Sequence, residues 1–300
     1  MEGQSLRAIA SARDLGWRRG AQAFTAGAML LLCSSMAIAA DRSADDEDDD
    51  EQKPSQATVY LDYRTTFAAL PPGVVAFGFR SFPRLQVSSE ASKLLILDFP
   101  LTIDLTDRVS IYGGPSTSTS RTETTSWRTM TLDSWNIGFE ADIYQQNGGA
   151  LPTVTLQSTL TRSIPDSLLS ATSTNTIVEL GYALNEDETR GFLAGAMYTS
   201  VFFDSPLPRV KPAVVGYVGG YYQWDNNWKL TARGGVQSFG GAQLLSFDPV
   251  KPFTKPIFRL DLEKLDDDDN RVFGLTAEVA WVPKPAFSLV LRTPLYFVKN

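Results

Sequence analysis

The sequence contains no histidine and a single cysteine, Cys33. Without histidine, no imidazole base can activate a serine or cysteine nucleophile, and a histidine-ligated metal centre is also excluded. One cysteine cannot form a disulfide within the chain. The fold must therefore be held together by backbone pairing and side-chain packing.

Long apolar runs are also missing after residue 39, so the mature chain offers no transmembrane helix, which would need about 20 such residues. The net charge of −7 provides no positive field for phosphates, which excludes nucleic acid as a partner. This charge is unevenly distributed: +2 in residues 1–39, −6 in 41–56 and −3 in 57–300. Most of the acidity therefore lies in one short segment.

Residues 1–39 predict a signal peptide. Three arginines within residues 13–19 precede an apolar stretch, 24–38, that closes on an A-x-A motif, so we expect cleavage before Ala40. Two alternatives stay open. One is an uncleaved membrane anchor, for which the stretch is short. The other is a lipoprotein modified at Cys33, which would normally follow a residue smaller than leucine.

Residues 40–56 predict a disordered periplasmic segment. The part from 41 to 56 holds eight acidic and two basic residues and almost no apolar side chains. Such a run cannot bury enough surface to fold. A role in binding divalent ions is the alternative.

From residue 57 onward, apolar and polar residues alternate in stretches of ten to thirteen residues, as at 135–144 and 287–297. A strand tilted across a bilayer needs about nine to eleven residues, whereas strands of soluble proteins usually have about five or six. Charged side chains recur in mid-strand, which is typical of a membrane barrel with an apolar outer and a polar inner wall. Turn signals separate eleven candidate strands: 94–105, 108–118, 132–145, 152–163, 173–185, 190–203, 213–224, 228–239, 256–265, 271–282 and 287–298.

Short polar turns alternate with longer connections rich in serine, threonine, proline and glycine. Bacterial barrels have this asymmetry and an even number of strands. A twelfth strand is supplied by 57–67 or by its rival 74–82, and either choice places both chain ends on the short-turn side. The sequence thus predicts an all-β fold, a transmembrane up-and-down antiparallel β-barrel of twelve strands over residues 57–300.

The run LTIDLTDRVSIYGG at 101–114 and the aromatic-ended last strand resemble Gram-negative outer-membrane β-barrels. The strand–LTDR–strand turn is similar to small barrels grouped as porin-like or putative small-solute transporters, including the phenol meta-pathway type. The resemblance implies an outer-membrane location, with membrane lipid and the barrel-assembly machinery as partners. It also implies that Phe297 is the terminal aromatic assembly signal, although three residues follow it. Pro100 and Pro294 depart from the pattern, because each removes a ladder hydrogen bond.

Aromatic residues predict two girdles at the membrane boundaries. Trp224 and Trp228 flank a short turn, with Tyr144, Tyr182 and Phe297 at the same level. The opposite boundary has Trp135, Trp281 and Phe239.

Charged residues on the less apolar face predict the lining of the lumen. They carry both signs with acids in excess, which predicts a narrow, mildly cation-preferring pore for small polar solutes. The candidates are Asp98, Asp104, Glu140, Asp142, Glu179, Lys229, Arg233, Arg259, Asp261, Glu263, Glu278 and Arg292.

Three other functions are alternatives to the pore. A closed structural or surface-interaction barrel would not conduct, and an exported soluble β-sandwich would bind its ligand in the periplasm. An enzyme is not expected, since the known barrel hydrolases depend on a histidine. We accordingly expect no catalytic residue, metal or cofactor.

Overall fold

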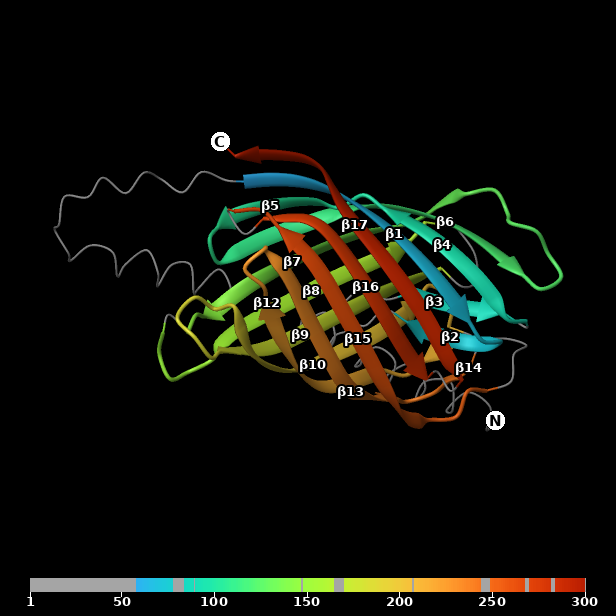
Figure 1. The fold of residues 1–300 in the computed structure, drawn as a ribbon. Helices are drawn as coiled ribbons and strands as arrows, with labels where there is room; N and C mark the ends of the chain where they lie inside the picture. Colours follow the sequence, from blue (N-terminus) through green and yellow to red (C-terminus); the bar gives the residue numbers. More distant parts are fainter. Residues whose placement is uncertain are drawn as a thin grey trace, which may run out of the picture. The chain divides into compact units, whose positions relative to one another are not determined.

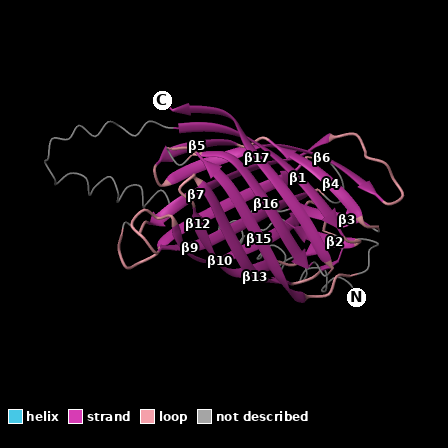
Figure 2. Cartoon of the chain, in the orientation of Figure 1, coloured by secondary structure: helices cyan, strands magenta, loops and turns pink. Residues whose placement is uncertain are grey.

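The computed structural model describes residues 58–77, 84–88, 90–146, 148–164, 170–206, 208–243, 249–267, 270–281 and 284–299. Of these, 74–77, 84–88 and 296–299 are described by their backbone alone. The predicted signal peptide and acidic segment lie outside the described residues. Figure 2 shows that the described part is built from strands and the loops that join them.

One antiparallel sheet closes on itself, because its last strand pairs with its first. Figure 1 shows the tilted strands that wrap around this barrel. The order in the sheet is β17, β16, β15, β13, β12, β10, β9, β8, β7, β6, β4, β1 and β5. The strands are β1 (Thr58–Leu70), β4 (Ser92–Asp98), β5 (Leu101–Thr106), β6 (Val109–Thr122), β7 (Thr131–Tyr144), β8 (Thr153–Ser163), β9 (Ala171–Ala183), β10 (Arg190–Phe203), β12 (Ala213–Gln223), β13 (Trp228–Phe239), β15 (Phe253–Leu265), β16 (Arg271–Trp281) and β17 (Pro285–Lys299).

β4 and β5 occupy one strand position between β1 and β6, so the barrel has the twelve positions that the sequence predicts. The predicted continuous strand 94–105 is wrong in one respect, because Phe99 and Pro100 divide it. Pro100 cannot donate to the ladder. Its carbonyl still accepts from the backbone N–H of Asp62, at 3.0 Å, so the wall remains closed at the break.

The first strand of the barrel is β1, which corresponds to the predicted 57–67. The rival segment 74–82 begins within β2 (Gly73–Phe77), which forms a separate hairpin with β3 (Arg84–Ser88). A second small pair joins β11 (Arg209–Val210) and β14 (Ala242–Gln243). The soluble β-sandwich alternative is wrong, because the barrel strands form one closed sheet.

Long and short connections alternate around the barrel as predicted. We call the two ends the long-connection end and the short-turn end. The start of β1 and the end of β17 meet at the short-turn end, where Thr58 is paired with Lys299 (Figure 1). There are two departures: the link 282–284 at the long-connection end has three residues, and the connection 145–152 at the short-turn end has eight, one more than 164–170. The long connections are 71–91, 123–130, 164–170, 204–212 and 240–252.

The outer wall of the barrel is apolar. On β9, for example, Ile177 and Glu179 are buried while Val178 and Leu180 are exposed. An exposed apolar surface that surrounds a barrel is typical of lipid contact. Large exposed hydrophobic side chains are found around the wall at Phe67, Leu101, Ile111, Ile137, Val178, Phe192, Val218, Val236, Phe258, Val272 and Leu289.

In the part of the chain that the structure describes, no helix is long and apolar enough to cross a membrane.

Aromatic side chains near the short turns agree with a girdle. Trp224 is exposed, and its ring lies 5.3 Å from that of Tyr222. At the other end, the rings of Trp281 and Phe258 lie 6.2 Å apart.

Phe239 is a correction to the predicted girdle. It is buried and packs against Phe253, with ring centroids 5.4 Å apart. Because Phe239 follows Arg233 by an even number of residues, strand alternation turns both side chains inward.

The inner wall is not polar throughout. Toward the long-connection end, buried apolar side chains interrupt the polar lining that the sequence predicts. This inner apolar layer includes Ala68, Leu70, Leu94, Ile96, Ile177, Met197, Val215, Ile257, Ala280 and Ala286. The charged residues of the inner wall therefore occupy the remaining part of the barrel.

Candidate functional site

A network of ion pairs on the inner wall is centred on Asp261. Arg233 Nη1 donates to Asp261 Oδ2, and Arg259 Nη2 donates to Oδ1, both at 2.8 Å. Thr276 donates its hydroxyl to Oδ1 at 2.6 Å. The side chains of Asp261 and Arg259 are 10% and 4% exposed. The carboxylate that bridges the two guanidinium groups is therefore buried.

The network extends across the wall in both directions. Arg233 Nε donates to Glu179 Oε2 at 3.1 Å, although β10 and β12 separate their strands. On the other side, Arg259 Nη1 lies 3.7 Å from Glu278 Oε2. We call Glu179, Arg233, Arg259, Asp261 and Glu278 the ionic network. Five of the predicted lumen residues are therefore linked by ion pairs into one network.

Tyr217 supports the ionic network by donating its hydroxyl to Glu179 Oε2 at 2.8 Å. Its ring lies over Gly195 on the neighbouring strand. A Cβ at Gly195 would be 2.5 Å from Tyr217 Cζ and 2.7 Å from the Val178 carbonyl oxygen. A glycine at 195 is thus required for the ring to lie flat against the wall.

We expect Gly195→Ala to lower the free energy of unfolding by about 1–3 kcal/mol, because the added methyl group displaces the Tyr217 ring. Urea titration of the folded protein in vesicles measures this change. The matched control is Gly216→Ala, where an added Cβ meets no atom within 4 Å. Equal midpoints for the two variants would contradict the packing argument.

Five of the seven remaining predicted lumen residues contact side chains outside the ionic network. Ser116 donates to Asp98, and Tyr60 donates to Asp104. Thr155 donates to Asp142 Oδ1 at 2.7 Å. Lys229 Nζ lies 4.8 Å from the centroid of the Tyr221 ring, and Glu263 Oε1 lies 2.6 Å from Arg271 Nε. The last two residues, Glu140 on β7 and Arg292 on β17, are half-buried.

Three charged residues of the inner wall were missed by the sequence-based prediction. Asp62 and Arg64 lie on the polar face of 57–67, so choosing that segment as the first strand would have revealed them. Arg271 stands at the start of β16, beside a register shift between Lys264 and Leu265. Period-two alternation alone does not predict the face at such an irregularity.

Phe297, the predicted assembly signal, pairs with Tyr60 through the backbone of β17. Its side chain lies outside the described residues. Pro294 coincides with a register shift between Leu61 and Asp62, which is where a strand tolerates proline.

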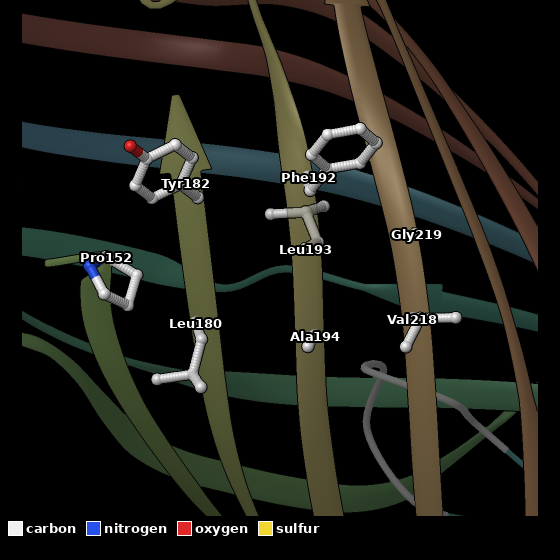
Figure 3. Close-up of a pocket in the computed structure, with 8 residues that line it drawn as sticks. All are labelled: Pro152, Leu180, Tyr182, Phe192, Leu193, Ala194, Val218 and Gly219. Atoms are coloured by element: carbon white, nitrogen blue, oxygen red, sulfur yellow. The ribbon is translucent and has the colours of Figure 1, made fainter. Parts of the chain in front are cut away.

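A hollow of about 540 Å³ lies away from the ionic network. Figure 3 shows its lining, where Leu180, Tyr182, Phe192 and Val218 extend from neighbouring strands. These four side chains are exposed on the apolar outer wall. The hollow therefore lies on the outside of the barrel, and we assign it no role in binding polar solutes.

Within the described residues, no three or more cysteine, aspartate or glutamate side chains are grouped so that they could hold a metal ion. The site consists of ionic and hydroxyl side chains on a rigid wall.

No protein-family model matches the sequence, and no curated protein matches it either. Among solved structures, an outer-membrane channel from Pseudomonas putida F1 has 13% identity, with 83% of this chain and 99% of that chain covered and a TM-score of 0.51. The chain therefore shares the fold of this outer-membrane β-barrel. The resemblance to outer-membrane barrels is thus confirmed for the fold, while the narrower likeness to the phenol meta-pathway type stays a prediction.

Two further structures are similar to the barrel with lower scores. The translocator domain of the autotransporter NalP from Neisseria meningitidis has 12% identity, coverage of 91% of this chain and 98% of that chain, and a TM-score of 0.44. A FadL homologue from Pseudomonas aeruginosa has 8% identity, coverage of 82% and 93%, and a TM-score of 0.38.

Proposed function

We propose that the protein forms a narrow, non-enzymatic channel for small polar solutes in the outer membrane of a Gram-negative bacterium. The observation that carries this proposal is the ionic network on the inner wall of a barrel whose outer wall is apolar. Buried ion pairs rarely stabilise a fold more than apolar packing of the same volume would. Fixed charges on a lumen wall, by contrast, select and orient polar solutes.

The channel is proposed to prefer cations weakly. Residues 57–300 carry a net charge of −3, and several of the inward carboxylates lie on β4 to β7, away from the arginines of the ionic network. Acidic linings favour cations. Pairing within the ionic network cancels much of the remaining charge, which keeps the preference small.

Planar-bilayer recordings on the purified full-length protein test both the conductance and the cation preference. We expect single-channel current steps. Under a KCl gradient, we expect a zero-current potential whose sign indicates a preference for cations. Glu140→Gln should move this potential toward the anion side, because it removes one inward carboxylate. Glu123→Gln, at an exposed position in a long connection, should leave it unchanged. Absence of conductance above background would refute the channel.

A closed structural or surface-interaction barrel is the second candidate. The inner apolar layer favours it, since Ile96 and Val215 are 2% and 0% exposed. Such a protein would keep the heat-dependent gel mobility of a folded barrel but show no conductance. Membrane lipid and the barrel-assembly machinery are the proposed partners in either case.

A further inference from the structure

Three arginines converge on the inner wall formed by β1, β16 and β17. Arg64 and Arg292 lie directly opposite each other on paired strands, and Gly274 is the partner of Arg292 on its other side. A Cβ at Gly274 would be 3.2 Å from Arg271 Cδ and 3.5 Å from Arg292 Cβ. We call Arg64, Arg271 and Arg292 the arginine cluster.

The carboxylates beside the arginine cluster form ion pairs with two of its members. Arg271 Nε lies 2.6 Å from Glu263 Oε1, and Arg64 Nη2 lies 3.6 Å from Asp62 Oδ2. Within the described ranges, Arg292 has neither a hydrogen bond nor an ion pair, and its Nε is buried without an acceptor. Asp98 also lies opposite Arg64 on the other neighbouring strand, so Arg292 is the member of the cluster whose charge no described carboxylate compensates.

This arrangement is unfavourable for the fold alone. Like charges directly opposite each other on paired strands destabilise a sheet. A guanidinium does not lose its proton in a protein, so Arg292 cannot relieve the repulsion from Arg64 by becoming neutral. An anion delivered from the lumen would compensate the excess charge and supply the missing acceptor.

We propose that Arg292, flanked by Arg64 and Arg271, forms an anion-binding site for the carboxylate or phosphate group of a small solute. The planar guanidinium group matches both groups through paired hydrogen bonds. This inference deepens the proposed function, because the solute reaches the site through the lumen. The weak cation preference reflects the net charge of the wall, whereas the arginine cluster is a local site within it.

Binding of acetate and of inorganic phosphate to the purified full-length protein in detergent, measured by calorimetry at constant ionic strength, tests the site. Acetate represents a carboxylate source and phosphate a phosphate source. We expect one or both to bind saturably, and Arg292→Gln to weaken binding roughly tenfold or more, since it removes a bidentate charged donor. The anion affinity of Arg292→Lys should lie between those of the wild type and Arg292→Gln, because lysine keeps the charge but loses the planar pair of donors.

The matched control is Arg162→Gln, which removes an arginine at the long-connection end that already pairs with Asp204 at 2.6 Å. It should bind both anions as the wild type does. Heat-dependent gel mobility checks that each variant is folded. In the absence of anion, Arg292→Gln should also raise the unfolding midpoint, because the opposed pair with Arg64 is relieved.

The outcomes separate this site from the channel. Failure of the wild type to bind either anion, or unchanged binding in Arg292→Gln, overturns the site even if the protein conducts. Anion binding lost in Arg292→Gln supports the site even if bilayer recordings show no conductance. Binding of acetate alone or of phosphate alone identifies the group that the arginine cluster receives.

Discussion

Replacing Asp261 with asparagine should lower the free energy of unfolding of the barrel by about 3–5 kcal/mol, the cost of breaking a buried ion pair from one side. Arg233 and Arg259 both depend on this carboxylate, each through a 2.8 Å contact. The amide keeps the size of the side chain but loses the charge at the centre of the ionic network, so Arg233 keeps Glu179 and Arg259 keeps Glu278 as a carboxylate partner. Urea titration of the protein folded in vesicles, read by the heat-dependent gel shift, measures the loss.

The control for this substitution is Asp204→Asn at the long-connection end. Hydrogen bonds from Arg162 hold the pKa of the Asp204 carboxyl below its ordinary value, but the pair is open to solvent and should contribute little to stability. Similar midpoints for Asp261→Asn and Asp204→Asn would show that the ionic network is not structural.

The strands of the barrel could be predicted because their signal is local. Alternation with period two and the lengths of the turns depend only on residues that are contiguous in the sequence. Together they predict twelve strand positions and the location of the long connections at one end of the barrel. Pro100 marks where a ladder hydrogen bond is missing, so even the division of one strand has a local signal. The choice between 57–67 and 74–82 lacked such a signal, because both segments alternate.

The site was harder to predict, because it depends on register. That Arg233 reaches Glu179 across two intervening strands follows from the register of four strands, which places Glu179 in one row with Gly235, two residues from Arg233. That Arg64 stands opposite Arg292 follows from closure between the first and last strands. Alternation assigned both Ile177 and Glu179 to one face, but it did not predict that apolar and charged residues would gather in separate zones of that face.

Substituting Val218 with arginine should destabilise the protein in vesicles by about 2–4 kcal/mol, the cost of a charge on the lipid face near the middle of a bilayer. Val218 lies midway along β12, and its side chain is 67% exposed on the outer wall. In a water-soluble protein, so exposed a position would accept arginine with little effect. The substitution therefore distinguishes a wall in contact with lipid from one in contact with water.

Met130→Arg provides the matched comparison, because Met130 is also an exposed apolar residue but lies in the connection 123–130. We expect its unfolding midpoint in vesicles to equal that of the wild type, while Val218→Arg unfolds at a lower urea concentration or fails to insert. Val218→Leu should behave as the wild type, which excludes side-chain size as the cause. If both arginine variants were equally tolerated, the outer wall would not face the hydrocarbon of a membrane, and a channel would lose its physical basis.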